Sequence, residues 1–203
     1  ILWVETEIPE EAQWLVPSFA TLYAPTNDTG EGYVYDAEGK LTDLSSPVLW
    51  NAEKPYLYTV VIEQAGEFIP IRVGLRDQQV NDKGELLING VSVKLKGVNH
   101  HDTHETKGYA ENFNDLEKDV KLMKEFNVNC VRTSHYPPDP FFLELCDHYG
   151  LYVVDEADIE THGIWDLGCD GGTISHDLKW APRYMDRVKR MYFRDRTHPS
   201  IIM

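Results

Sequence analysis

The strongest constraint on the fold is an alternation of strand-like and helix-like segments that begins at Val93 and continues to the last residue. The strand-like segments are short, apolar and rich in β-branched residues, whereas the helix-like segments have apolar residues at intervals of three and four. Strands are predicted at 93–98, 128–133 and 151–155, with another beginning at 201–203, and helices at 114–126, 140–149 and 182–194. Such alternation is typical of a parallel sheet covered by helices.

Capping residues predict where two of these helices begin and end. Asn114, with Glu117 three residues later, predicts the start of the first helix. Asp139 is the predicted cap of the second helix, and Pro140 is its first residue. Gly150 predicts its end, because glycine is favoured directly after a helix.

A doubly wound sheet and a β/α barrel both fit the alternation, and the loop after the first strand favours the barrel. Residues 96–100 contain one glycine and end in an imidazole, unlike a glycine-rich phosphate loop. A complete (β/α)8 TIM barrel takes about 250 residues, and residues 90–203 are fewer than half that number. We therefore predict the first half of a barrel, within a domain that spans 78–203.

Residues 1–77 have a different pattern, in which no helical period is present. Short alternating segments, separated by Pro, Gly, Asn and Asp, predict an antiparallel sandwich. The segments lie at 2–8, 18–23, 32–35, 56–63 and 71–76. They are fewer than the roughly seven strands of an immunoglobulin-like fold, so we predict such a sandwich, incomplete at its N-terminus and ending near Asp77. A hairpin at Asn89 and Gly90 is predicted to lead into the barrel.

The charge balance disfavours two classes of partner. With 19 basic and 34 acidic side chains, the net charge of −15 opposes binding to nucleic acid and to anionic membranes, and neither partner is expected. The basic cluster at 183–196 also contains Asp186 and Asp195, which predicts a solvated helix face. The sequence contains no run of eighteen apolar residues, so no transmembrane helix is predicted.

The cysteines and the chain ends bear on the setting of the protein. Cys130, Cys146 and Cys169 are widely spaced and form no C-x-x-C pair, which predicts reduced thiols and favours a cytoplasmic location. The chain begins without Met or a signal peptide and ends within an apolar run, so we expect it to be part of a longer protein.

Polar residues follow each of the three complete strands of the predicted barrel. They are Asn99, His100, His101, Asp102 and His104, then Arg132, Ser134 and His135, then Asp155, Glu156, Asp158, Glu160 and His162. Because the carboxyl ends of barrel strands surround the active site, these residues are predicted to line one.

Two groups among these residues have the chemistry of metal ligands. Glu160 and His162 lie two residues apart and are predicted to share a hard cation such as Mg²⁺ or Mn²⁺; the alternative is an ordinary Glu beside a hydrogen-bonded His. A zinc cluster of His100, His101 and His104 is less favoured, because it has no helical i, i+4 pair and no neighbouring Cys.

Two charged residues near the strand ends require partners. Arg132 ends an apolar strand and should face a carboxylate, although the sequence identifies no partner. Glu156 follows an apolar run and is expected to hold neighbouring loops by hydrogen bonds.

Four segments closely resemble the β-galactosidases of glycoside hydrolase family 2, and the resemblance extends over about 48–203. The four segments are GVNHH at 97–101, VRTSHYP at 131–137, CDHYGL at 146–151 and VVDEADIETHG at 153–163. The resemblance implies a retaining glycosidase that hydrolyses terminal, non-reducing β-D-galactose, as in lactose, through a covalent galactosyl-enzyme. No residue of this chain matches the acid/base or the nucleophilic Glu of the family, so the chain alone is expected to be inactive.

The resemblance also implies roles for the strand-end residues. His101, His135 and Asn99 would contact the sugar, and Arg132 would orient the nucleophile. Glu160 and His162 would bind Mg²⁺ together with the acid/base Glu, so that the ion is weak or absent in this chain. His100 and His104 stay without a role, because some relatives have Arg at position 100 and others have His at position 103.

The family implies partners as well. The whole protein would bind a β-galactoside and Na⁺ and form a homo-oligomer, while this chain is expected to self-associate through the open edge of its half-barrel.

Three other interpretations stay open. A β-glucuronidase of the same family shares Asn99, His101 and residues 132–137 but is not expected to carry the pair of Glu160 and His162; a β-mannosidase is the other family specificity. A non-catalytic carbohydrate-binding module and a divalent-metal hydrolase that uses the histidine cluster are the alternatives from other classes.

Overall fold

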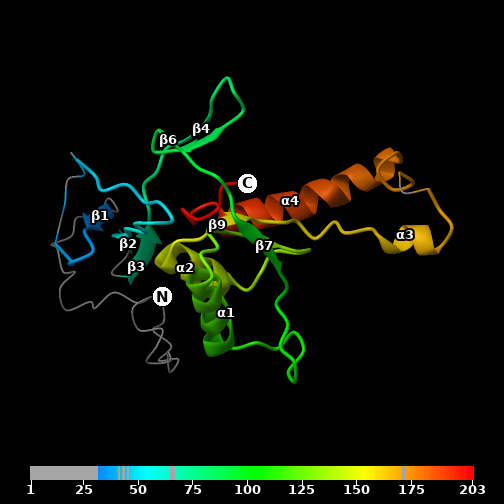
Figure 1. The fold of residues 1–203 in the computed structure, drawn as a ribbon, viewed down its shortest axis with the longest axis horizontal. Helices are drawn as coiled ribbons and strands as arrows, with labels where there is room; N and C mark the ends of the chain where they lie inside the picture. The colour runs from blue at the N-terminus through cyan, green and yellow to red at the C-terminus, as the bar shows by residue number, and fades with distance from the viewer. Residues whose placement is uncertain (1–31, 41, 43, 45, 65–66, 171) are drawn as a thin grey trace.

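The computed structural model describes residues 32–203 except 41, 43, 45, 65–66 and 171 (Figure 1). The strands predicted at 2–8 and 18–23 therefore lie outside the described residues. The strands are β1 (Gly32–Tyr35), β2 (Tyr58–Gln64), β3 (Glu67–Val73), β4 (Gln78–Val80), β5 (Leu86–Ile88), β6 (Val91–Ser92), β7 (Gly97–His100), β8 (Cys130–Thr133) and β9 (Tyr152–Val154). The helices are α1 (Phe113–Glu125), α2 (Pro140–Tyr149), α3 (Gly163–Asp166) and α4 (Ala181–Asp195), with a 3₁₀ turn at Leu178–Trp180.

The first three strands form an antiparallel sheet in the order β1-β2-β3. The strand predicted at 32–35 is confirmed. The strands predicted at 56–63 and 71–76 are present but wrong in their bounds, because β2 spans Tyr58–Gln64 and β3 begins at Glu67. Pro70 pairs with Val61 inside β3. β3 is an edge strand, where a residue without a backbone N–H is tolerated, so this proline does not mark a loop.

The predicted hairpin is confirmed between β5 and β6. Ile88 pairs with Val91, and the two intervening residues, Asn89 and Gly90, have φ angles of 52° and 78°. Positive φ at both positions is the requirement of a type I′ turn.

Three parallel strands form a further sheet in the order β7-β8-β9. The polar residues predicted to line an active site lie at or just after the ends of these strands. Ile201 extends the row through a parallel bridge with Val153. Because successive strands are neighbours and the order does not reverse, the arrangement is that of a partial α/β barrel, as predicted. The first strand was predicted at 93–98, which is wrong: Val93 donates its N–H to the Leu86 carbonyl and so extends the antiparallel hairpin, and β7 begins only at Gly97.

The helices between these strands begin and end at identifiable caps. The predicted cap of α1, Asn114, is wrong by two residues: Asn112 accepts from the Asp115 N–H at 3.1 Å, and Asp115 accepts from the Asn112 N–H at 3.1 Å. Asp115 thus has the reciprocal role that was assigned to Glu117. In α2 all three predictions are confirmed, with Asp139 as cap, Pro140 in the first turn and Gly150 at the end, where its φ is 80°.

Two hydrophobic clusters cover the two faces of the parallel sheet. The first lies between sheet and helices and contains Phe113, Leu116, Val120, Val131, Phe142, Leu143, Leu145, Cys146, Leu151 and Val153. The second contains Trp50, Ala52, Leu57, Ile88, Cys130, Tyr152 and Ile202. Residues 50–57, which precede the predicted boundary near Asp77, are therefore part of the packing that supports the barrel strands. Trp50 strengthens this contact by donating its indole N–H to the Asp147 carbonyl at 2.9 Å.

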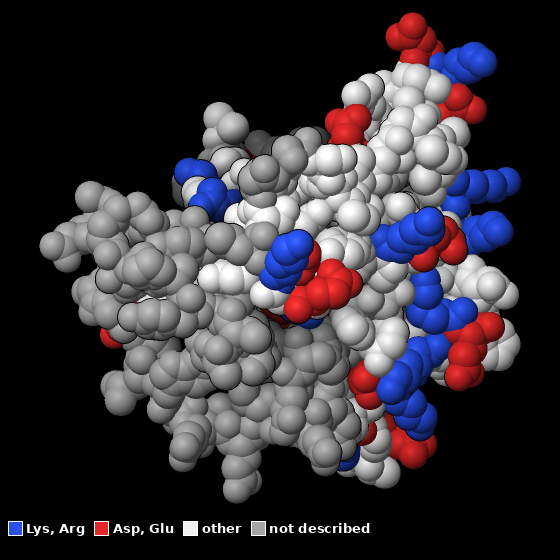
Figure 2. Space-filling model, turned by 90° about the vertical axis from the view of Figure 1, so that its left-hand side faces the viewer, with Lys and Arg blue, Asp and Glu red and all other residues white. Residues whose placement is uncertain are grey.

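Helix α4 extends away from the sheet together with α3 (Figure 1). Its basic residues are partly neutralised, since Arg190 pairs with Asp186 at 2.9 Å and Arg187 lies 3.8 Å from Asp158. Figure 2 shows the face of the molecule that lies on the left-hand side of Figure 1. Over the described part of this face, Lys and Arg side chains lie beside Asp and Glu side chains. Among the described residues, no helix has both the length and the apolar character needed to cross a membrane.

Candidate functional site

Three residues occupy equivalent positions in the parallel sheet near its carboxyl end. Asn99 of β7 pairs with Arg132 of β8, and Arg132 pairs with Val154 of β9. Because side chains alternate between faces, these three share a face with Cys130 and Tyr152 and point away from the helices. Asn99 and Arg132, both predicted site residues, therefore lie side by side.

Arg132 has its carboxylate partner within the chain. Its Nε lies 2.6 Å from Oε2 of Glu156, its Nη2 lies 3.1 Å from Nδ1 of His135, and its Nη1 donates to Asn99 at 3.5 Å. The sequence alone identifies no partner for this arginine. The signal is the strand register: Glu156 lies two residues beyond Val154, and residues two apart in an extended segment point to the same side.

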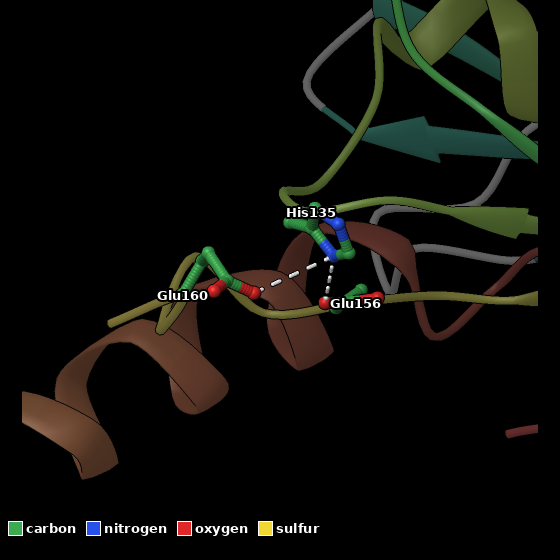
Figure 3. Close-up of side chains that lie close together, drawn as sticks. All are labelled: His135, Glu156 and Glu160. Carbon is green, nitrogen blue, oxygen red and sulfur yellow. Dashed lines mark hydrogen bonds and ion pairs between the residues drawn. The ribbon is translucent and has the colours of Figure 1, made fainter. Parts of the chain in front are cut away.

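His135 lies at the centre of the site. Its Nδ1 is 2.8 Å from Oε1 of Glu156 and 3.7 Å from Oε2 of Glu160 (Figure 3). The ring of His101 approaches the His135 ring edge-on, with 5.6 Å between centroids. The peptide bond between Ser134 and His135 is cis. Both predicted sugar-contacting histidines are therefore neighbours at the ends of adjacent strands.

Buried hydroxyl groups fix the segments that carry these residues. The Glu156 N–H donates to Oγ1 of Thr133 at 3.0 Å, and that hydroxyl donates to Asp155 at 3.3 Å. Ser134 donates its hydroxyl to the His100 carbonyl at 3.2 Å. The ends of β7, β8 and β9 are thus tied to one another by hydrogen bonds of buried hydroxyl groups.

The other two histidines of the predicted zinc cluster point elsewhere. His100 is buried, stacks on Phe142 at 4.5 Å and has Nε2 3.0 Å from Asp119. His104 lies 3.6 Å from Asp115 at the start of α1. Within the described ranges, neither histidine belongs to a group of three potential metal ligands. The structure therefore does not bring the three imidazoles together.

The predicted pair of Glu160 and His162 is joined through the backbone. Oε1 of Glu160 accepts from the His162 N–H at 3.0 Å, while the His162 ring lies 5.7 Å from the Trp165 ring. In the part of the chain that the structure describes, the one group of three His, Cys, Asp or Glu residues with ligand atoms within 4.8 Å of one another is His135, Glu156 and Glu160.

Asp155, the residue before Glu156, forms a buried acidic pair with Asp195. Burial, followed by the charge of Asp195 and a hydrogen bond with it, raises the pKa of Asp155 to about 7. Asp195, at the end of α4, is 2% exposed and pairs with Arg194. This pair links the end of β9 to α4.

Glu160 also faces solvent through a surface pocket of about 190 Å³. Trp180, from the 3₁₀ turn, and Arg183 and Tyr184, from the first turn of α4, contribute to its wall. The site is consequently open on this side.

Comparison with known proteins identifies the family. Residues 79–203 match the family model described as glycosyl hydrolases family 2, TIM barrel domain. A β-galactosidase of Alteromonas mediterranea is 47% identical over 167 residues, which are 79% of this chain and 16% of the relative. A β-galactosidase of Psychromonas ingrahamii is 44% identical over 173 residues, 82% of this chain and 16% of the relative.

A solved structure shares the fold. It is a Ruminococcus gnavus β-glucuronidase in complex with uronic isofagomine, which superposes with a TM-score of 0.74 at 24% identity and covers 85% of this chain and 33% of its own. The chain spans about 16% of the length of the curated relatives named above. The model match and the two sequence relatives together show that this chain belongs to glycosyl hydrolase family 2, with residues 79–203 in its TIM barrel domain.

Proposed function

We propose that this chain forms one wall of the sugar site of a retaining β-galactosidase, which removes terminal β-D-galactose from substrates such as lactose. The observation that carries the proposal is the network at the strand ends, where Arg132 contacts Asn99, His135 and Glu156. The 47% and 44% identical relatives named β-galactosidase support this choice of sugar.

The proposed roles follow from position and chemistry. His101, His135 and Asn99 are exposed or half-buried and offer donors and acceptors to sugar hydroxyls. Hydrogen bonds of this kind accelerate the reaction when they strengthen as the sugar approaches the oxocarbenium-like transition state. Arg132 would orient the nucleophile, and its pairing with Glu156 holds the guanidinium at the strand end.

Retaining hydrolysis needs two carboxylates about 5 Å apart. We assign both carboxylates, the nucleophile and the acid/base, to parts of the whole protein other than this chain. Glu156 is engaged by Arg132 and His135, which supports a positioning role for it.

The proposal includes a Mg²⁺ ion, which would supply a fixed positive charge beside the sugar, and a Na⁺ ion in the whole protein. The pair implied for Mg²⁺, Glu160 and His162, does not fit an ion in this structure, because the two residues meet through a backbone N–H. No step of the reaction is assigned to that pair.

Further parts of the proposal concern the whole protein. We propose that the whole protein contains an immunoglobulin-like sandwich that ends near Asp77, forms a homo-oligomer and lies in the cytoplasm. For the chain alone, we include self-association through the open edge of the half-barrel.

The test compares nitrophenyl β-galactoside, β-glucuronide and β-mannoside as substrates of the full-length protein. The expected result is the highest kcat/KM on the galactoside. Preference for the glucuronide would replace the proposal with the specificity named for the structural neighbour. Saturable galactose binding without turnover of any glycoside would instead support a carbohydrate-binding module.

A further inference from the structure

The His101 ring, which we propose as a sugar contact, is exposed at the end of β7. Its neighbours are the ring of His135, 5.6 Å away between centroids, and the ring of Tyr136, 6.4 Å away. Within the described residues, the nitrogens of the His101 ring form no hydrogen bond. The direction of this ring therefore depends on how the chain is held on either side of it, at His100 and at Asp102.

The side chain of His100 is buried and contacts both α1 and α2. Its Nε2 lies 3.0 Å from Oδ2 of Asp119 in α1, and its ring stacks on Phe142 of α2 with 4.5 Å between centroids and 11° between planes. The His100 carbonyl accepts from the N–H and the hydroxyl of Ser134, at 3.1 and 3.2 Å. The residue before His101 is thus fixed to two helices and to the end of β8.

Asp102, the residue after His101, is fixed to the start of α2. Its Oδ2 accepts from the Asp139 N–H at 2.8 Å, and its own N–H donates to the Tyr136 hydroxyl at 3.1 Å. Its other oxygen, Oδ1, lies 3.6 Å from Nδ1 of His100. The two residues that flank His101 therefore face each other through one nitrogen and one carboxylate oxygen.

This contact between Nδ1 of His100 and Oδ1 of Asp102 requires a proton. Nε2 of His100 faces the Asp119 carboxylate and so carries a hydrogen as the donor. In a neutral ring with that hydrogen, Nδ1 is a lone pair that faces the lone pairs of Asp102, and Nδ1 is buried with no hydrogen-bond partner among the described residues. A proton on either atom replaces this repulsion by a hydrogen bond.

The surroundings of the contact favour retention of the proton. Burial raises the pKa of Asp102 above its ordinary value, and the hydrogen bond from the start of α2 and the charge of His100 lower it without cancelling the effect of burial. Burial also raises the pKa of Glu111, whose Oε2 is buried with no hydrogen-bond partner in the described ranges. The titratable and charged groups around the contact are Asp119 of α1, Glu111 of the preceding loop, Asp139 at the start of α2, Tyr136 of the loop after β8 and Arg194 of α4.

We propose that His100 is a positioning residue, which holds the His101 ring against His135 through a proton shared with Asp102. The inference rests on the proposed function, because the sugar contact of His101 is part of that function. With the proton in place, hydrogen bonds run from α1 through His100 and Asp102 to the start of α2. Loss of the proton at high pH leaves two facing acceptors, so the loop that carries His101 moves away from them.

The first measurement uses the 203-residue chain and observes the His101 ring by NMR. Nuclear Overhauser effects between the rings of His101 and His135 should be present at pH 6 and weaken by pH 9. They should be lost in His100→Phe, which keeps the aromatic stack on Phe142 and removes both nitrogens. Asp102→Asn should keep them at both pH values, because an amide accepts from the α2 N–H and donates permanently to Nδ1.

The matched control is His104→Gln, which changes a histidine of the same loop that faces Asp115 and not Asp102. It should show the Overhauser effects and the pH dependence of the parent chain. Circular dichroism verifies that each variant is folded. Asp102→Ala, which removes the partner of Nδ1, should also lose the effects and replaces His100→Phe if that variant does not fold.

The second measurement uses the full-length protein with nitrophenyl β-galactoside. His100→Phe should lower kcat about tenfold and change KM less than about twofold, because a displaced His101 ring weakens a contact that strengthens in the transition state. Asp102→Asn should restore the kcat of the parent and move its alkaline decrease to higher pH.

Retention of the Overhauser effects in His100→Phe, or a normal kcat of this variant, would overturn the proposal. A pH dependence of the effects in Asp102→Asn equal to that of the parent chain would overturn the shared proton. Loss of the effects in His100→Phe, together with no turnover of any glycoside by the parent protein, would overturn the proposed function and support the positioning of His101 by His100.

Discussion

Individual charged residues in this chain are stabilised by partners from other segments of the chain. Arg132 would be costly at the end of an apolar strand without a counter-charge, and Glu156 supplies one at 2.6 Å. The same principle applies to Asp147, which is 1% exposed and pairs with His198 at 2.6 Å. Each pair joins segments that are distant in the chain.

The first prediction at this scale concerns His135 in the full-length protein. His135→Ala should lower kcat about 10-fold to 100-fold, with a smaller rise in KM, because a hydrogen bond to a charged group contributes about 1.5–3 kcal/mol. Steady-state kinetics on nitrophenyl β-galactoside measures the effect. His104→Ala is the control, since His104 pairs with Asp115 at the start of α1. A normal kcat for His135→Ala would contradict the proposed sugar contact.

The second prediction concerns the buried ion pair of His198 and Asp147, whose Nδ1 and Oδ2 are 2.6 Å apart. Burial lowers the pKa of His198, but the hydrogen bond to Asp147 and nearby carboxylates outweigh burial and raise the pKa above 6.5. A raised histidine pKa stabilises the fold fully below the unfolded value, and this contribution is lost as pH rises through the folded value.

His198→Gln keeps a neutral donor and removes the charge. We therefore expect it to be about 1–2 kcal/mol less stable than the parent chain at pH 5.5 and nearly equal at pH 9. Urea denaturation across this range measures the difference, with His176→Gln in an exposed turn as control. A deficit that does not change with pH would show that packing, and not charge, accounts for the role of His198.

At the scale of elements, the end of α2 is shaped by a contact with the segment that precedes the barrel. Gly150 ends the helix with a φ of 80°, and a Cβ at this position would overlap the backbone of Ala52. Lys124 of α1 donates to the carbonyls of Ala52 and Gly150 at 3.1 and 2.8 Å. This one glycine thus serves both the helix end and the packing of a distant segment.

The third prediction compares two glycines with nearly equal φ. Gly90, at 78°, has open space where a Cβ would lie, so Gly90→Ala should cost about 1–2 kcal/mol of unfolding free energy through conformational strain alone. Gly150→Ala should cost clearly more, because strain is added to the overlap with Ala52. Urea denaturation of both variants decides this. Equal losses would show that the contact between α2 and Ala52 is loose.

At the scale of the whole molecule, the chain contains part of a barrel with polar residues gathered at its strand ends. The three parallel strands and the bridge at Ile201 hold the polar residues in place from below, through two hydrophobic clusters. Several side chains of the sheet stay exposed, among them Val98 at 41%. Such a site is open to water, which weakens every electrostatic contact within it.

The fourth prediction follows from this incompleteness. The 203-residue chain should show no turnover of a chromogenic β-galactoside above the blank, with or without Mg²⁺, because we assign the nucleophile and the acid/base carboxylate to other parts of the whole protein. A Glu156→Gln, Glu160→Gln double variant provides the comparison. Turnover that disappears in this variant would assign the catalytic carboxylates to these two residues.

Local patterns were sufficient to predict most elements. The helix caps Asp139, Pro140 and Gly150 and the turn at Asn89 and Gly90 depend on backbone preferences of a few adjacent residues, and these predictions are confirmed. The resemblance of four short segments likewise identified the family. Errors arose where two signals competed locally, as at Asn112 and Asn114 or at Pro70 in an edge strand.

Only the tertiary structure determined which polar residues meet. The sequence predicted that His135, Arg132 and Glu160 lie at strand ends, but the pairing of Arg132 with Glu156 depends on the register between β8 and β9. The grouping of His135 with Glu160, and the separation of His100 and His104, depend on the directions of side chains at the end of β7 and in the loops after the strands. A sequence determines local conformation through short-range preferences, whereas contacts between strands form only when the packed sheet sets their relative positions.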